Sequence, residues 1–184
     1  MIKKLLFCLG ISIVLLLNQV QISAEVYQIP PDLLKEVAKN ERLFDKDQNS
    51  KEARFELAMS YAYTGQIEKG WATLSKLPES YADTVITKYE KIISDNPKEW
   101  KPHFKVAFGY YFKKQKDKAI QSFEEVLKID PKHIWAMGFI ALVKGEKGEV
   151  DEAIALCNKA LEIEPNAAAI HFLRGEAYRR KGDY

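Results

Sequence analysis

A repeat of 34 residues constrains the fold of this chain more than any other feature. Pro97, Pro131 and Pro165 follow one another at intervals of 34 residues, and the segments that lead to the last two, KAIQSFEEVLKIDP and EAIALCNKALEIEP, align without a gap. Within each interval the apolar residues form two patterns of helical period. The proline ends the second pattern because it cannot continue a helix. Each interval therefore predicts a pair of antiparallel helices.

Residue size keeps the same period. Small residues recur where the two helices of a pair must approach closely, Ala107 and Ala141 in the first helices and Ala119 and Ala153 in the second. One pair alone cannot bury its apolar faces, so neighbouring pairs must stack into a continuous core. The sequence thus predicts an all-α fold built as a solenoid of helix pairs.

This pattern resembles the tetratricopeptide repeat, whose unit combines W-x2-L-G-x2-Y in a first helix with A-x3-F and a closing proline in a second. The first aromatic residue of that pattern is absent here, and Lys144 replaces the tyrosine in one copy. The resemblance implies a right-handed superhelical solenoid whose concave face, lined mainly by first helices, binds peptides. The matching residues are His103, Val106, Ala107, Tyr110, Ala119, Phe123 and Pro131 in one copy and Met137, Ile140, Ala141, Lys144, Ala153, Cys157 and Pro165 in the next.

Residues 1–24 have the organisation of a secretory signal peptide. Lys3 and Lys4 precede an apolar run at 5–17, and residues 22–24 form a suitable cleavage end before Glu25. The alternative is an uncleaved membrane anchor, but the run is shorter than the roughly 20 residues that a spanning helix needs. We therefore expect an exported protein of the periplasm, the cell envelope or the extracellular space. It would contact a membrane only through this segment, if the segment is uncleaved.

Charge and cysteine content argue against several classes of protein. The formal net charge is +2, and without Lys3 and Lys4 the chain carries equal numbers of basic and acidic residues. This balance does not favour binding to nucleic acid. Once the signal segment is removed, Cys157 is the only cysteine, so no intramolecular disulfide can form. Cys157 occupies the position of Phe123 in the preceding copy, which predicts a small buried side chain.

The rest of the chain varies the repeat. We expect residues 25–50 to form a lead-in and an N-terminal capping helix, and 51–97 to form a diverged repeat plus an extra helix over 81–94. Two regular repeats follow at 98–131 and 132–165. Residues 166–184 begin another copy, either as a capping helix or as an incomplete repeat of a longer protein. The turn signature in the last four residues favours the incomplete repeat.

First-helix residues away from the packing positions should line the concave face. Phe104, Phe108 and Phe112 are spaced i, i+4, i+8 and so form one stripe. An exposed aromatic groove exceeds the apolar patch that a monomer usually tolerates, which predicts that a hydrophobic or amphipathic segment of a partner covers it. The alternative is that these residues belong to the core, covered by superhelical curvature or by residues 26–44 folding back. The predicted groove comprises Phe55, Met59, Tyr63, Phe104, Phe108, Tyr111, Phe112, Trp135, Phe139, Leu142 and Phe172.

A weaker alternative is a calcium-responsive module at residues 45–56. Asp45, Asp47, Asn49 and Glu56 match positions one, three, five and twelve of an EF-hand loop. However, Ser50 replaces the glycine of the sharp turn, and Glu56 falls inside the next predicted helix. A calcium site is therefore not the favoured interpretation.

Catalytic chemistry has little support in the sequence. His103, His133 and His171 are dispersed without metal-ligand spacing, and neither a nucleophile–base arrangement nor a Gly-rich phosphate loop is present. We therefore predict no enzymatic activity, no cofactor and no metal.

The sequence favours an exported scaffold or adaptor that mediates protein–protein interaction through the predicted groove. The expected partner is a protein or peptide with a hydrophobic or amphipathic segment, not nucleic acid or a small-molecule substrate. The alternative is the truncated helical module of a larger exported enzyme or envelope assembly factor.

Overall fold

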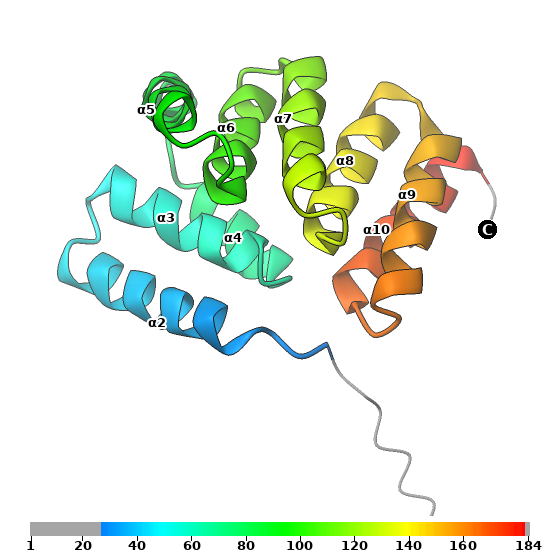
Figure 1. The fold of residues 1–184 in the computed structure, drawn as a ribbon, viewed down its shortest axis with the longest axis horizontal. Helices are drawn as coiled ribbons and strands as arrows, with labels where there is room; N and C mark the ends of the chain where they lie inside the picture. Colours follow the sequence, from blue (N-terminus) through cyan, green and yellow to red (C-terminus); the bar gives the residue numbers. More distant parts are fainter. Residues whose placement is uncertain (1–26, 183–184) are drawn as a thin grey trace, which may run out of the picture.

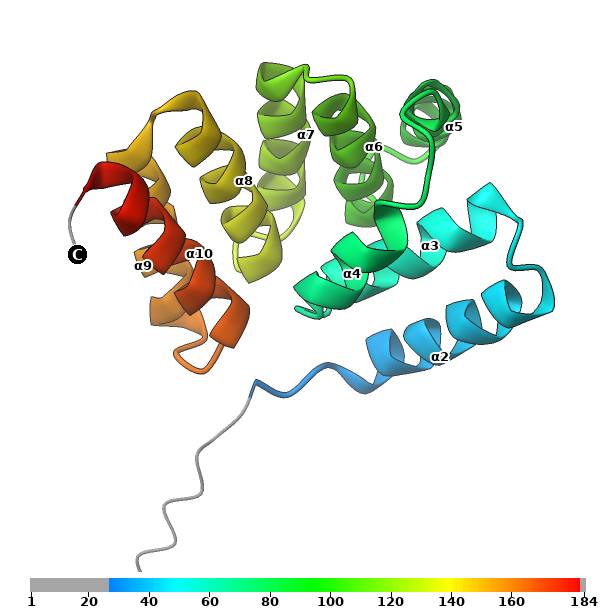
Figure 2. The same ribbon diagram turned by 180° about the vertical axis from the view of Figure 1, so that it is seen from behind.

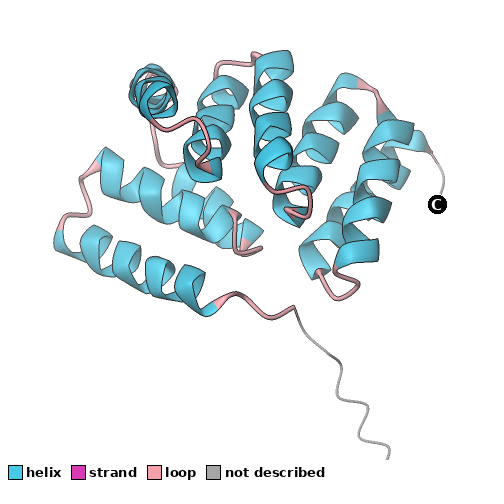
Figure 3. Cartoon of the chain, in the orientation of Figure 1, coloured by secondary structure: helices cyan, strands magenta, loops and turns pink. Residues whose placement is uncertain are grey.

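The structure is a computed structural model that describes residues 27–182, so the predicted signal peptide at 1–24 lies outside the described residues. Within residues 27–182 the chain forms helices joined by short loops, without a strand (Figure 3). This confirms the predicted all-α solenoid. The helices are α2 (Pro31–Lys46), α3 (Lys51–Ala62), α4 (Ile67–Leu74), α5 (Tyr81–Asp95), α6 (Trp100–Phe112), α7 (Lys116–Ile129), α8 (Ile134–Lys147), α9 (Val150–Ile163) and α10 (Ala168–Lys181).

Helices α6 to α10 form a regular array in which each helix packs on the next (Figure 1). The small residues lie between the helices of a pair, as the repeat pattern predicts. Ala107 on α6, Ala119 on α7 and Ala153 on α9 are fully buried, and Ala141 on α8 is almost so. Short side chains at these positions let the paired helices approach closely and bury the larger side chains on either side.

The turns inside the pairs follow the same 34-residue period. Gly148 and Gly182 cap α8 and α10 with φ of 87° and 85°, in the left-handed region that glycine enters without steric cost. The equivalent residue after α6 is Lys114, which has a φ of 59°. A non-glycine side chain in this region carries conformational strain.

The N-terminal helices α2 and α3 pack directly on one another. The Ser50 hydroxyl caps α3 by accepting a hydrogen bond from Ala53 N at 3.1 Å. Val37 of α2 packs on Leu57 and Tyr61 of α3 in a small apolar cluster of their own. The α2–α3 contact therefore has its own hydrophobic support, separate from the main core.

Helix α5 interrupts the regular stacking. It is seen along its axis in Figures 1 and 2, whereas α2 and α3 lie across the view. Gly109 lets α5 approach α6, since a Cβ at that position would lie 2.8 Å from Ile86 Cγ1 and 3.1 Å from Val85 Cγ1. Helix α5 packs on α6 in the position of a second helix, and the α3–α4 pair lies across the direction of α6 and α7 (Figure 1).

The main core runs from α3 to α10 without a break. Among residues 27–182, no helix is both long and apolar enough to cross a membrane.

Candidate functional site: a cleft beneath the N-terminal segment

The structure corrects the expectation that the predicted groove is open to solvent. Tyr111, Phe112 and Leu142 are half-buried, and Phe172 of α10 is 70% exposed. The other seven, Phe55, Met59, Tyr63, Phe104, Phe108, Trp135 and Phe139, are at most 4% exposed and belong to the core.

Phe104 and Phe108 of the α6 stripe are buried, and Phe112 is half-buried, because α6 is covered on opposite sides. The Phe104 ring lies 5.2 Å from the ring of Phe123 on α7 and 5.6 Å from that of Phe139 on α8. The Phe108 ring is 4.8 Å from Phe139. These edge-to-face contacts fill the space between successive repeats. The stripe therefore joins the repeats together instead of facing the concave side.

Sequence reasoning did not select Trp71, which covers the other side of α6. Its ring lies 6.1 Å from Phe108, 5.8 Å from Tyr111 and 6.4 Å from Phe112. Trp71 stands on α4, a helix that the regular repeat pattern alone would not turn toward this face. The available signal was α6 itself, which is largely apolar around its circumference apart from Lys101 and Lys105, as expected of a helix that other elements surround on most sides.

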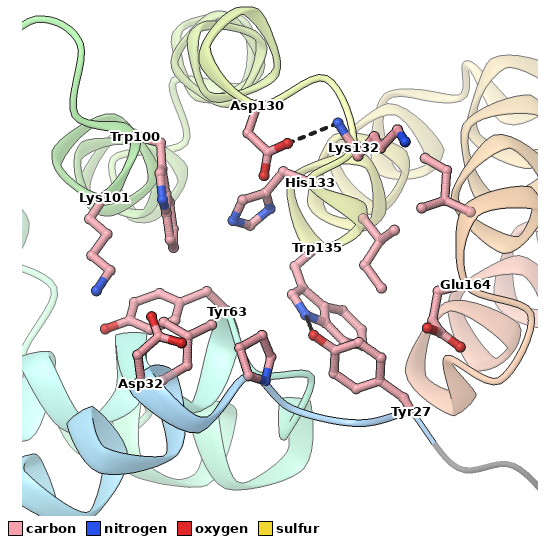
Figure 4. Close-up of a pocket in the computed structure, with 14 residues that line it drawn as sticks. Tyr27, Asp32, Tyr63, Trp100, Lys101, Asp130, Lys132, His133, Trp135 and Glu164 are labelled. Atoms are coloured by element: carbon pink, nitrogen blue, oxygen red, sulfur yellow. Dashed lines mark hydrogen bonds between the residues drawn. The ribbon is translucent and has the colours of Figure 1, made fainter.

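A cleft of about 430 Å³ remains between the N-terminal segment, the start of α6, the α7–α8 turn and the end of α9 (Figure 4). Two residues of the predicted groove, Tyr63 and Trp135, line it. They are joined by Tyr27, Trp100, His133 and Glu164. Its walls therefore combine aromatic rings with aliphatic and charged side chains.

Tyr27 covers Trp135 at one end of the cleft. Trp135 Nε1 donates a hydrogen bond to Tyr27 Oη at 3.3 Å, and the rings meet edge to face at 5.1 Å. Burial raises the pKa of Tyr27. On its other side the Trp135 indole packs over the backbone of Gly65, where a Cβ would lie 2.3 Å from the ring. Glycine at position 65 therefore allows the indole to lie against the α3–α4 turn.

His133 stands at the centre of the cleft and begins α8. Its Nδ1 accepts a hydrogen bond from Ala136 N at 3.1 Å, so the neutral ring carries its proton on Nε2. The ring lies 4.4 Å from Trp100. Burial lowers the pKa of His133 to about 4 despite the opposing charge of Asp130. The imidazole is thus a neutral N–H donor at physiological pH.

The opposite edge of the cleft carries a charged network. Lys101 Nζ pairs with Glu36 of α2, and Glu36 also accepts a hydrogen bond from Tyr63. Lys101 lies 5.6 Å from the centroids of both Tyr63 and Trp100, within cation–π range. Burial and the neighbouring Glu36 carboxylate raise the pKa of Tyr63. This network fixes α2 against the start of α6.

The calcium alternative does not agree with the position of Glu56. Glu56 lies within α3, where its Oε2 is 2.5 Å from Lys105 Nζ of α6 and its other oxygen accepts from Tyr89 of α5. Asp47 instead accepts hydrogen bonds from the backbone of Asn49 and Ser50. The carboxylate expected at the twelfth position is thus committed to other helices. Among the described residues, no group of three or more His, Cys, Asp or Glu could hold a metal ion.

The remaining candidates for chemistry have structural roles. His103 Nε2 donates to Pro97 O at 3.0 Å, and His171 Nε2 donates to Pro165 O at 2.8 Å, one repeated contact between a first helix and the preceding turn. Cys157 is fully buried, as predicted, and burial raises the pKa of its thiol to about 11. A buried neutral thiol is a poor nucleophile. Lys144 pairs with Glu149 and Glu152. The cleft can therefore recognise a ligand through contact with its aromatic rings, through the N–H of His133 and through the charged side chains at its edge.

Comparisons with known proteins agree with the repeat architecture. The family described as "TPR repeat" matches residues 145–182, and the family described as "Tetratricopeptide repeat" matches residues 109–133. The Protein STIP1 homolog of Dictyostelium discoideum is 34% identical over 73 residues, which is 40% of this chain. The chain spans only 13% of the length of that relative.

Solved structures of low sequence identity share the fold. The crystal structure of TTC0263, a thermophilic TPR protein in Thermus thermophilus, aligns with a TM-score of 0.54 at 19% identity, covering 78% of this chain and 89% of that one. The crystal structure of MamA aligns with a TM-score of 0.51 at 18% identity, covering 80% and 77%. The chain therefore contains tetratricopeptide repeats and has the fold of a tetratricopeptide solenoid.

Proposed function

We propose that this chain is a protein-interaction scaffold that holds an extended segment of a partner in the cleft around Trp100, His133 and Trp135. The repeats found in the chain favour a role in protein interaction. The geometry of the cleft supports the proposal further, because it gathers aromatic rings from the end of α3 and from α6 and α8 at one hollow of the surface. Aromatic side chains supply contact area at low entropic cost and are enriched among residues that dominate binding.

The chemistry of the cleft favours a short hydrophobic or amphipathic segment. About 430 Å³ accommodates a few side chains but not a folded surface. Apolar side chains of the partner would lie against Trp100 and Trp135, and a carbonyl or carboxylate oxygen would accept from His133 Nε2. Lys132, which is exposed at the edge, would favour an acidic group there. This assignment replaces the buried predicted groove by a smaller site that shares Tyr63 and Trp135 with it.

We also propose that the protein is exported. The support is the sequence of residues 1–24, with two lysines, an apolar run and a cleavage end. N-terminal sequencing of the protein from its native cells should read Glu25 first. A chain that retains Met1 and stays in the cytoplasm would contradict export without affecting the proposal for the cleft.

The partner proposal is tested by photo-crosslinking in native cells. A photoreactive residue replaces Lys132 at the cleft edge, and in a separate variant it replaces Lys159, which is exposed on α9 away from the cleft. The adducts are identified by mass spectrometry. We expect a discrete adduct from position 132 that is absent from position 159.

A second substitution makes the result specific to the cleft. Ile163 lines the cleft and is 38% exposed, so Ile163→Asp places a charge in the site at little cost to the fold. The adduct from position 132 should then disappear. If it persists, or if positions 132 and 159 give the same adducts, partners do not use the cleft.

A further inference from the structure

The N-terminal segment lies on the cleft in the manner of a bound peptide. Residues 27–30 precede α2 and have no regular secondary structure. Along them, Tyr27 and Ile29 are half-buried while Gln28 and Pro30 are exposed, the alternation of an extended chain on a surface. Pro30 has φ −52° and ψ 136°, close to the polyproline II conformation. This segment, Tyr27–Pro30, is called the strap below.

Tyr27 fixes one end of the strap to the cleft. Tyr27 contributes the ring contact and the 3.3 Å hydrogen bond to Trp135. A partner segment that reached both Trp135 and His133 would make more contacts in the same space than Tyr27 makes.

Helix α2 does not depend on the strap for its position. Asn40 Nδ2 donates to Glu56 O at 3.3 Å, and Tyr61 Oη donates to Glu41 at 2.7 Å. Together with the apolar contact of Val37 on α3, these bonds lie beyond the first turns of α2. The strap can therefore leave the cleft while α2 stays docked. The prolines at positions 30 and 31 keep it stiff and close by.

We propose that the strap is a replaceable internal ligand of the cleft, covering Trp135 until a partner segment displaces it. The inference rests on the proposed function, since it assigns a regulator to the same site. An attached segment competes at an effective concentration that is typically millimolar. A partner segment must bind the cleft tightly enough to displace the strap at that effective concentration. Segments with weaker affinity therefore do not gain access to the cleft.

The test compares the wild-type protein with Tyr27→Ala by NMR of the indole N–H groups. The chain has three tryptophans, and Trp135→Phe assigns the resonance of Trp135. In Tyr27→Ala, we expect this resonance to shift and the indole proton of Trp135 to exchange faster with water. Tyr27→Phe, which keeps the ring but removes the acceptor, should also move it, by a smaller amount. The control is Tyr178→Ala, which removes an exposed tyrosine on α10 and should leave the resonance in place.

The competitor is a synthetic peptide with the sequence of residues 27–32, YQIPPD. We expect saturable binding to Tyr27→Ala in the millimolar range and about twofold or more weaker binding to the wild-type protein, whose own strap competes at a similar effective concentration. The same peptide with alanine in place of tyrosine should not bind.

The outcomes separate the inference from the proposed function. Equal affinity for both proteins would overturn the inference but leave the cleft as a binding site. An unchanged Trp135 resonance in Tyr27→Ala would likewise overturn the inference alone, because Tyr27 would not cover the indole. A shifted resonance without peptide binding to either protein would overturn both, since the uncovered cleft would not accept an extended segment.

Discussion

The buried imidazole of His133 should make the stability of this protein depend on pH below neutrality. In the folded chain burial lowers the pKa of His133 from 6.5 to about 4. The unfolded chain therefore binds a proton at His133 over this range that the folded chain does not. Stability is complete above about pH 6.5 and is lost as the pH falls toward about 4. Each tenfold difference in proton affinity corresponds to about 1.4 kcal/mol, so the loss from this group is ~3 kcal/mol.

The substitution His133→Asn isolates this contribution. Asparagine does not titrate in this range, and its side chain can still accept a hydrogen bond from Ala136 N at the start of α8. Urea unfolding of both proteins at several pH values between about 7.5 and 4 gives the free energy of unfolding. The carboxylates titrate in both proteins, so their contribution cancels in the difference.

We expect the advantage of the wild-type protein over His133→Asn to shrink by ~3 kcal/mol between about pH 7 and pH 4. His171→Asn, which removes an exposed histidine, controls for the substitution itself. A constant difference across the pH range would refute the reasoning, because it would mean that the fold does not hold His133 neutral.

Three further predictions concern packing and turns. Gly109→Ala should lower the free energy of unfolding by about 1–3 kcal/mol, because its Cβ would overlap with α5. Gly175→Ala on α10, where a Cβ would contact nothing within 4 Å, should instead raise it by about 0.5–1 kcal/mol; the same sign for both would contradict the close approach of α5. Lys114→Gly should also stabilise, by about 0.5–1 kcal/mol, because it relieves the positive φ, and an unchanged thermal midpoint would count against that strain. Phe108→Ala should lower the free energy of unfolding, measured with urea, by about 3–5 kcal/mol, as expected for a core aromatic residue. A loss below about 1 kcal/mol would mean that Phe108 is exposed and not part of the core.

The repeated part of the fold could be predicted because its signals are local. The spacing of Pro97, Pro131 and Pro165 marks where helices end, and small residues such as Ala107 and Ala119 mark where helices touch. Both are read within one period and depend only on the helix and its partner. The burial of these alanines agrees with that prediction.

The candidate site could not be predicted in the same way because it depends on contacts between distant segments. Whether Phe108 and Phe112 face solvent or protein depends on where α4 places Trp71, whose ring packs on both. Tyr27 lies alone in a short extended segment, without a periodic pattern to indicate its contact with Trp135. The composition of α6 did carry a signal, since a helix that is largely apolar around its circumference is surrounded by protein on most sides.

The contacts that seat the N-terminal helices also affect the order of folding. Solenoid repeats usually touch only their neighbours, which favours fast folding from any point. Here Glu56 bonds to Lys105 across 49 residues, Glu36 to Lys101 across 65, and Tyr27 to Trp135 across 108. During synthesis from the N-terminus, α2 and α3 therefore emerge well before the residues that neutralise their carboxylates. Their final docking must wait until α6 and α8 have formed, so the first helices to be made are among the last to reach their native positions.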